Sequence, residues 1–168
     1  MVLVNLILIL LLGGVVAAVS ERASSVMPRM VALSVIVLAF FYLVFHLSGL
    51  NGLKQLQSST LDDPSSWLIH FKTSWIPAFG INIEFALDGL SLLMVLLTLM
   101  LGAIAVSASW TDITERHGFF EANLLWTIAG VLGVFMAMDL FLFFLFWEVM
   151  LIPMYFLIAI WGHKNRGY

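Results

Sequence analysis

Five apolar segments, each long enough to cross a lipid bilayer, dominate the sequence. A membrane-spanning helix needs about 17–25 consecutive residues that are mostly apolar. The segments of this kind are residues 2–19, 30–48, 85–109, 119–137 and 139–162. Only 10% of the 168 residues are charged, and the mean hydropathy is +1.09, whereas soluble domains carry about 25% charged residues. We therefore predict an all-α integral membrane protein with five transmembrane helices in a single membrane domain, residues 1–168.

The composition also excludes several kinds of chemistry. The chain has no cysteine, so it holds no disulfide and no thiolate-bound zinc or iron–sulfur cluster. Its sequence has no glycine-rich nucleotide-binding motif and no pair of mid-segment histidines that could bind haem. The net charge is −3, and no basic patch is present for nucleic acid. We expect a chain that lies in the lipid bilayer, binds no metal or cofactor, and does no redox chemistry itself.

The first apolar segment has only part of the pattern of a secretory signal peptide. Small residues at 17–20 resemble a cleavage site, but a signal peptide carries basic residues before its apolar run. The first basic residue here is Arg22, which follows the run. We therefore predict that residues 2–19 remain as the first span, with the N-terminus outside.

The distribution of basic residues predicts the orientation in the membrane. With five spans, one side of the membrane carries the turns at 20–29 and 110–118 and the tail at 163–168. The basic residues of that side are Arg22, Arg29, Arg116, Lys164 and Arg166, and those of the other side are Lys54 and Lys72. Because cytoplasmic loops are enriched in Lys and Arg, we place the first side in the cytoplasm. The N-terminus and the long loop 49–84 then face the periplasm.

The second half of the long loop 49–84 shows alternating apolar residues. Trp67, Ile69 and Phe71 alternate with other residues before Pro77, and residues 81–85 alternate after Gly80. A period of two around a Pro/Gly turn is typical of a β-hairpin. The alternative is an irregular interfacial loop that holds Trp67 and Trp75 at the level of the lipid headgroups.

Glu148 is the residue that most suggests a function. It is the only charged residue among residues 140–163. A carboxylate near the centre of a membrane helix costs roughly 2.5–3.5 kcal/mol on insertion scales, so such a residue is usually paired or used. We interpret Glu148 as a proton or ion site near the middle of the membrane. The alternative is a structural acid, protonated or ion-paired, that holds helices together.

Pro153 lies five residues beyond Glu148 in the same segment. Proline has no N–H, so the carbonyl group of Val149 loses its helical partner and the turn beside Glu148 is loosened. Such kinks also occur in membrane helices for reasons of shape alone. Pro153 therefore supports a site at Glu148 but does not identify one by itself.

Three other acidic residues lie at predicted span boundaries. Asp139 falls between the last two apolar segments, where it marks a tight turn and is suited to cap a helix. Asp88 and Glu121 lie near the starts of the third and fourth spans, where a carboxylate is favoured by the helix dipole. Glu121 has a second interpretation as a proton entry group.

Two segments of the chain resemble a known family. They are residues 75–99, WIPAFGINIEFALDGLSLLMVLLTL, and residues 133–164, GVFMAMDLFLFFLFWEVMLIPMYFLIAIWGHK. Both are similar to the antiporter-like membrane subunit M of the bacterial proton-pumping NADH–quinone oxidoreductase (complex I), the equivalent of mitochondrial NADH dehydrogenase subunit 4. The second segment is the more specific, and the match runs in order along the whole chain.

The resemblance implies a role for Glu148. In that family the glutamate of the Phe-Trp-Glu triplet belongs to a proton channel and pairs with a lysine on a later helix. It also implies that the chain is an N-terminal fragment, the first part of an antiporter-like fold of roughly fourteen helices with inverted repeats. NAD, FMN, iron–sulfur clusters and quinone would belong to partner subunits of the enzyme. The partners would be other membrane subunits of complex I, above all the neighbouring antiporter-like ones, in the bacterial inner membrane.

Two other functions are compatible with the sequence. One is a membrane subunit of a multisubunit Na⁺/H⁺ antiporter or of a related hydrogenase, since these share the same glutamate. The other is a structural membrane subunit that conducts no ion.

Overall fold

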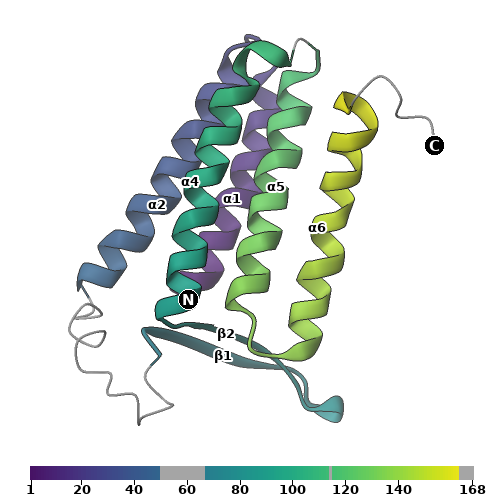
Figure 1. Cartoon of the computed structure of the whole chain (residues 1–168). Coiled ribbons are helices and arrows are strands. Elements are labelled where there is room, and N and C mark those ends of the chain that lie inside the picture. The colour runs from purple at the N-terminus through teal and green to yellow at the C-terminus, as the bar shows by residue number, and fades with distance from the viewer. Residues whose placement is uncertain (50–66, 114, 163–168) are drawn as a thin grey trace.

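A computed structural model describes residues 1–49, 67–113 and 115–162, which form five long helices with a β-hairpin across one end (Figure 1). The loop residues 50–66, including Lys54, and the tail 163–168, including Lys164 and Arg166, lie outside the described residues. The elements are α1 (Val2–Ser20), α2 (Met27–Gly49), β1 (Ile69–Ile76), a 3-10 turn (Pro77–Phe79), β2 (Ile81–Leu87), α4 (Gly89–Asp112), α5 (His117–Met136) and α6 (Leu140–Trp161). All five helices are long and apolar enough to cross a membrane, which confirms the predicted fold class.

The predicted start of the third span was wrong. The third span begins at Gly89 rather than at Phe85, because residues 81–87 pair with β1 as a strand. Asp88 caps the new helix start, since its side chain accepts a hydrogen bond from the Ser91 N–H at 2.7 Å. That bond holds the pKa of Asp88 below its ordinary value. A strand therefore brings the chain to the membrane, and a capped helix enters it.

The predicted β-hairpin is present in residues 69–87. β1 and β2 are antiparallel, with Ile69 opposite Leu87 and Phe71 opposite Phe85. Between the strands, Gly80 adopts φ = +69°, a left-handed conformation that glycine tolerates best. Figure 1 shows the hairpin beneath the ends of several helices. We call this end of the molecule the hairpin end, and the end with the α1–α2 and α4–α5 connections the turn end.

Four helices, α1, α2, α4 and α5, form the core. Close packing is possible where small residues face larger ones, as at Gly102, where an added Cβ would lie 2.5 Å from Ile128 Cδ1. The fully buried large residues of these helices are Leu3, Leu6, Leu10, Ile36, Leu43, Val95, Leu99, Leu125, Leu132, Met136 and Glu121. α6 lies at the edge of the bundle beside α5 (Figure 1). Only Leu142 and Pro153 of α6 are buried.

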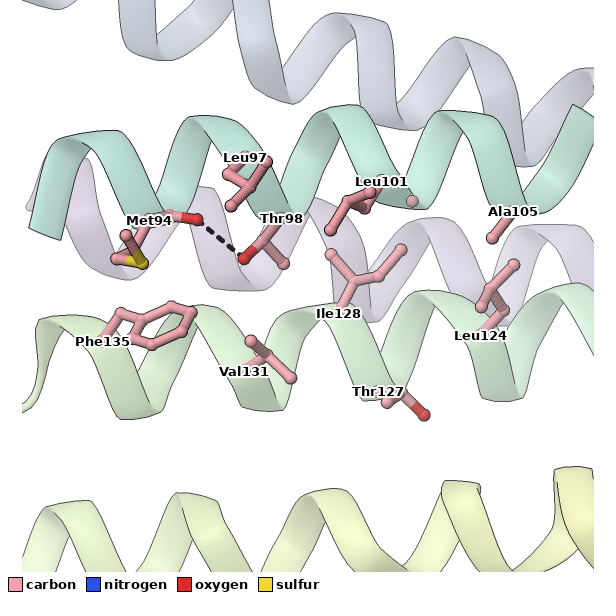
Figure 2. A pocket seen from close by; sticks show the side chains of 11 residues that line it. Met94, Leu97, Thr98, Leu101, Ala105, Leu124, Thr127, Ile128, Val131 and Phe135 are labelled. Carbon is pink, nitrogen blue, oxygen red and sulfur yellow. Dashed lines mark hydrogen bonds between the residues drawn. The ribbon is translucent and has the colours of Figure 1, made fainter.

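A shallow apolar groove of about 400 Å³ follows the outer side of α4 and α5. Figure 2 shows Leu97, Leu101, Val131 and other apolar side chains in it. Its two threonines donate their hydroxyls to their own helices, Thr98 to the Met94 carbonyl and Thr127 to the Asn123 carbonyl, both at 2.8 Å. The groove therefore offers no free polar group and is a packing surface.

Candidate functional site

Glu148 lies near the middle of α6. It is the ninth of the 22 residues of the helix, so it lies about 12 Å along the axis from the first residue, at about 1.5 Å per residue. The hydrocarbon core of a bilayer is about 30 Å thick. If α6 spans the bilayer, the carboxylate lies close to the midplane.

The side chain of Glu148 lies on the face of α6 that points away from the bundle. Helix residues are separated by about 100° around the axis, so Glu148 is about 200° from Phe146, which packs against Gly133 of α5. The neighbours of Glu148 on the outer face include the exposed side chains of Phe144 and Ile152. Within the described part of the chain, Glu148 has no hydrogen-bond or ion-pair partner.

Pro153 lies on the opposite, inner face of α6. It is buried and borders a cavity of about 180 Å³ between α1, α5 and α6, together with Val149 and Trp126. The indole N–H of Trp126 is not free to bind a ligand in this cavity, because Nε1 donates to the Leu11 carbonyl at 3.0 Å. α6 remains helical through Pro153 to Trp161. The loosened turn beside Glu148 therefore stays a prediction, and the two residues do not share a face.

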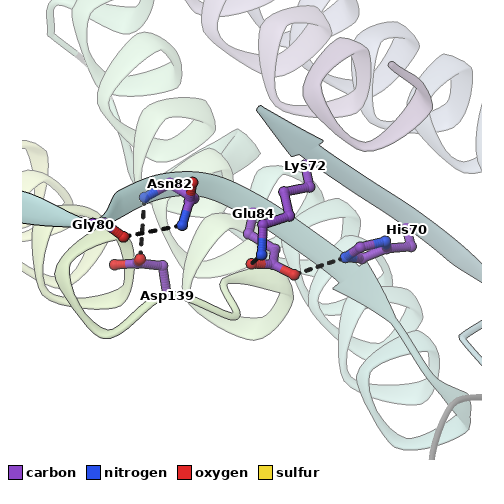
Figure 3. Close-up of polar contacts among 6 residues, drawn as sticks. All are labelled: His70, Lys72, Gly80, Asn82, Glu84 and Asp139. Atoms are coloured by element: carbon purple, nitrogen blue, oxygen red, sulfur yellow. Dashed lines mark hydrogen bonds and ion pairs between the residues drawn. The ribbon is translucent and has the colours of Figure 1, made fainter. Parts of the chain in front are cut away.

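The hairpin end of α6 is fixed by Asp139, as Figure 3 shows. Its Oδ1 accepts hydrogen bonds from the N–H groups of Phe141 at 2.8 Å and Leu142 at 3.4 Å, which confirms the predicted helix cap. Its Oδ2 accepts a third bond from the Asn82 N–H of β2 at 3.2 Å. The Asn82 bond and the two cap bonds hold the pKa of Asp139 below its ordinary value. One carboxylate thus joins the start of α6 to the hairpin.

The hairpin makes two further contacts with the residues before Asp139. The Met138 N–H donates to the Glu84 carbonyl at 2.9 Å, and Phe85 forms a β-bridge with Ala137. The Glu84 side chain lies 2.8 Å from Lys72 Nζ and 2.9 Å from His70 Nε2 (Figure 3). Its bonds with Lys72 first, and His70 second, keep the pKa of Glu84 below its usual range. The hairpin therefore carries a small charged cluster directly beside the α6 attachment.

The turn end of α6 is also attached. Trp161 Nε1 donates to the Glu115 carbonyl at 3.0 Å. The Trp161 ring also packs against Phe120 of α5, with ring centroids 5.2 Å apart. α6 is thus attached at both ends, while the outer face of its middle, with Glu148, is uncovered.

Glu121 does not lie where the sequence suggested. It is the fifth residue of α5, the helix has no acidic residue in its first turn, and no side chain caps that helix. The Glu121 side chain is 1% exposed, and its Oε2 has no hydrogen-bond partner. The interpretation of Glu121 as a carboxylate at a helix start was therefore wrong. The signal that could have indicated burial is the spacing of Glu121, Leu125, Ile128 and Leu132, which repeats with the period of one helix face.

These features limit the chemistry available. The described residues contain no group of three His, Cys, Asp or Glu side chains that could hold a metal ion. A single carboxylate on an apolar face can bind a proton or pair with a cation, and it needs one or the other in a membrane. The predicted ion or proton site at Glu148 would therefore need a second surface to complete it.

Comparisons with known proteins identify what the chain is similar to. Residues 137–168, which contain Glu148, match the family model described as NADH:quinone oxidoreductase/Mrp antiporter, TM. NADH-quinone oxidoreductase subunit M of Pseudomonas aeruginosa is 48% identical over 165 residues, a match that covers 98% of this chain and 32% of the relative. The chain thus spans about a third of the length of the curated relatives it matches.

Two solved structures have the same fold. One is a subunit in the structure of the membrane-bound sulfane sulfur reductase, an archaeal respiratory membrane complex, with a TM-score of 0.69 and 21% identity over 96% of this chain and 23% of that one. The other belongs to the Mrp complex from Dietzia sp., with a TM-score of 0.62 and 23% identity over 96% of this chain and 16% of that one. At this level of identity the likeness concerns the fold alone.

Proposed function

We propose that the chain forms part of a proton-translocating membrane subunit of an NADH–quinone oxidoreductase. The premise is that it is a homologue of NADH-quinone oxidoreductase subunit M along nearly its whole length. The enzyme class rests on the relatives, and the role of individual residues rests on the geometry of α6.

The unpartnered carboxylate of Glu148 carries the proposal for the site. A charged side chain on the lipid-exposed face of a helix is costly, and intramembrane acids usually face a protein interior or a water-filled cavity. A further protein surface, from the same subunit or a neighbour, would cover the outer face of α6. That surface would bring a cation or a chain of water molecules to Glu148.

The mechanism we propose is electrostatic. While a cation lies beside Glu148, the carboxylate stays ionised, and when the cation withdraws, the carboxylate takes up a proton from water. Moving one charge across the membrane requires about 2.3 kcal/mol per 100 mV. One pKa unit corresponds to about 1.4 kcal/mol. A change of a few pKa units, as one buried ion pair forms and breaks, therefore supplies a free energy of the size needed to move the proton. The turn that Pro153 is predicted to loosen, at the Val149 carbonyl, would help water reach this level.

Redox chemistry would take place in partner subunits. NAD, FMN, iron–sulfur clusters and quinone would be bound there, and the partners of this chain would be the other membrane subunits, especially antiporter-like ones. We place the protein in the bacterial inner membrane with the hairpin end in the periplasm. The positions of Arg22, Arg29 and Arg116 at the turn end and Lys72 at the hairpin end support this orientation.

A second candidate is a cation/proton antiporter subunit, because the matching family model covers both classes and the Mrp complex has the same fold. Purification of the assembly that contains a tagged chain, followed by reconstitution in sealed vesicles, separates the two. We expect the preparation to oxidise NADH with a quinone and to acidify one compartment without sodium. A preparation that lacks NADH oxidation and exchanges sodium for protons would instead support the antiporter.

A further inference from the structure

The most unusual buried group outside the α6 site is the carboxyl group of Glu121. Glu121 occupies a core position in the row that also contains Leu125, Ile128 and Leu132, with exposed fractions of 1%, 0%, 5% and 0% in that order. The whole row faces the interior of the four-helix core. An ionised carboxylate without a partner in such surroundings is strongly disfavoured, so it must gain a partner or a proton.

The packing places Arg29 at the same level. Gly102 of α4 packs against both Ile128 of α5 and Ile36 of α2. Glu121 lies seven residues before Ile128 on α5, and Arg29 lies seven residues before Ile36 on α2. Each is therefore about 10 Å nearer the turn end, at the same level. Arg29 is itself buried, with 8% of its surface exposed, and it contacts His117, which lies one helical turn before Glu121 on α5. Even so, Arg29 and Glu121 form no ion pair.

Arg29 is instead held by other groups. Its Nη2 lies 2.7 Å from the carbonyl oxygen of Ile113 and 3.0 Å from Nδ1 of His117, and its guanidinium lies over the Trp110 ring. A guanidinium only donates hydrogen bonds, so Nδ1 of His117 must accept. His117 is therefore neutral in this arrangement and carries its proton on Nε2. The Arg29 guanidinium is thus held by groups other than Glu121.

We propose that Glu121 is a second proton-binding site, in which the acid is held neutral in the helix core and Arg29 and His117 control its protonation. In the arrangement of the structure, Glu121 carries the proton, His117 is neutral and Arg29 is bound to His117. If His117 takes up a proton on Nδ1, it can no longer accept from Arg29. The guanidinium then turns to Glu121, which releases its proton as it forms the ion pair.

One proton is gained at His117 and one is lost from Glu121, so the net charge of the cluster is +1 in both arrangements. His117 is half-exposed at the turn end and is the member of the cluster that meets solvent. The other titratable groups around Glu121 are few. α1 brings Glu21 against Gly118, α4 brings Asp112 at its exposed end, and α6 faces this part of α5 with Phe156 and Trp161.

This site is separate from Glu148. Gly130 of α5 packs against Met150 of α6, so Glu148 is level with residue 132 on α5. Glu121 lies eleven residues away, about 16 Å along the axis. The inference therefore stands whether or not Glu148 translocates protons.

Infrared spectroscopy of the assembled membrane protein at neutral pH tests this inference. We expect the wild type to show a carbonyl band of a protonated carboxylic acid that is lost in Glu121→Gln and retained in Glu148→Gln. A Glu121→Gln spectrum without a lost acid band, or with a lost carboxylate band instead, would overturn the proposal.

Two variants that keep Glu121 test the control by Arg29 and His117. His117→Phe removes the imidazole acceptor, so Arg29 should pair with Glu121 and the acid band should disappear. Arg29→Gln removes the cation, so the band should persist. Persistence of the band in His117→Phe, or its loss in Arg29→Gln, contradicts the switch.

Discussion

α5 and α6 are neighbouring antiparallel helices, each with one glutamate, and they are stabilised in opposite ways. In the most apolar 18-residue stretch of each helix, 56% of the residues are buried in α5 and 11% in α6. α5 packs along its length in the core and has no side-chain cap. α6 is attached through its two ends and one packed face, and Glu148 lies on its uncovered face. The same residue type thus has a core environment in one helix and a face open to a partner in the next.

The comparison shows why burial cannot be inferred from hydropathy in such a chain. α6 is apolar on all sides although most of it is exposed in the isolated chain. In a bilayer an exposed apolar side chain meets lipid, so hydrophobicity alone does not drive it into the protein core. Polar residues therefore identify the functional faces better than apolar residues do.

The largest structural effect should come from separating α6 from α5. A Cβ atom at Gly130 would lie 2.6 Å from the Met150 Cβ and 3.2 Å from its Cα, so Gly130→Val forces the helices apart. We expect a loss of about 1–3 kcal/mol in the free energy of unfolding, as for other overpacked sites. Thermal unfolding in detergent measures it.

Gly49→Val is a matched control, because an added Cβ at Gly49 meets nothing within 4 Å among the residues that the structure describes. It should leave the unfolding temperature nearly unchanged. Equal losses in the two variants would show that close α5–α6 packing does not stabilise the chain.

A smaller effect is expected at the hairpin end of α6. Asp139→Ala removes two cap bonds and the bond to Asn82. The unfolding temperature should fall, and hydrogen exchange should increase in the first turn of α6 but not in α5. Equal increases in both helices would contradict the view that α6 depends on its ends.

Acidification should also lower the stability, in the same direction as Asp139→Ala. The pKa of Asp139 is lowered by hydrogen bonds to the carboxylate, so its contribution to stability is present above the ordinary pKa of an aspartate, about 3.9. The contribution is lost as the pH falls through the lower folded pKa. Asp139→Asn can still cap the helix but does not titrate there. The stability difference between wild type and Asp139→Asn should therefore narrow as the pH falls, and a constant difference would argue against the link.

The smallest effect is expected from the hairpin ion pair. The side chain of Lys72 is 52% exposed and that of Glu84 is 20% exposed, and pairs of this kind contribute below about 1 kcal/mol. Lys72→Ala should lower the unfolding temperature slightly at low salt and not at high salt. A large fall in the unfolding temperature that does not depend on salt would mean that the charged cluster holds the hairpin against α6.

Much of this architecture could be predicted from the sequence, for physical reasons that differ between regions. The five spans follow from length and apolarity, and the hairpin from its alternation around Gly80. Asp88 and Asp139 were predictable as helix-start residues because carboxylates are suited to accept free N–H groups there. The start of α4 was misplaced because the last three residues of β2, 85–87, are as apolar as the helix that follows.

The burial of Glu121 could not be predicted in the same way. The spacing of Glu121, Leu125, Ile128 and Leu132 places them on one helix face, but in a helix that is apolar on nearly every side the sequence does not say whether that face is the inner or the outer one. The contacts of Arg29 with Ile113 and His117 join residues 84 and 88 positions apart, and no local pattern indicates them. The link from Asp139 to Asn82 is equally non-local. Glu148 stood out in the sequence because it is the one charge in α6, but its partner is not among the described residues.

Proton translocation in sealed vesicles, measured per NADH oxidised, tests the central claim about Glu148 most directly. In the assembled complex, Glu148→Gln keeps the shape of the side chain and removes the titrating carboxyl, whereas Glu148→Asp keeps the carboxyl. We predict that Glu148→Gln lowers translocation at least about tenfold, equivalent to about 1.4 kcal/mol, with normal assembly, and that Glu148→Asp retains most of it. Unchanged translocation in Glu148→Gln would contradict the account.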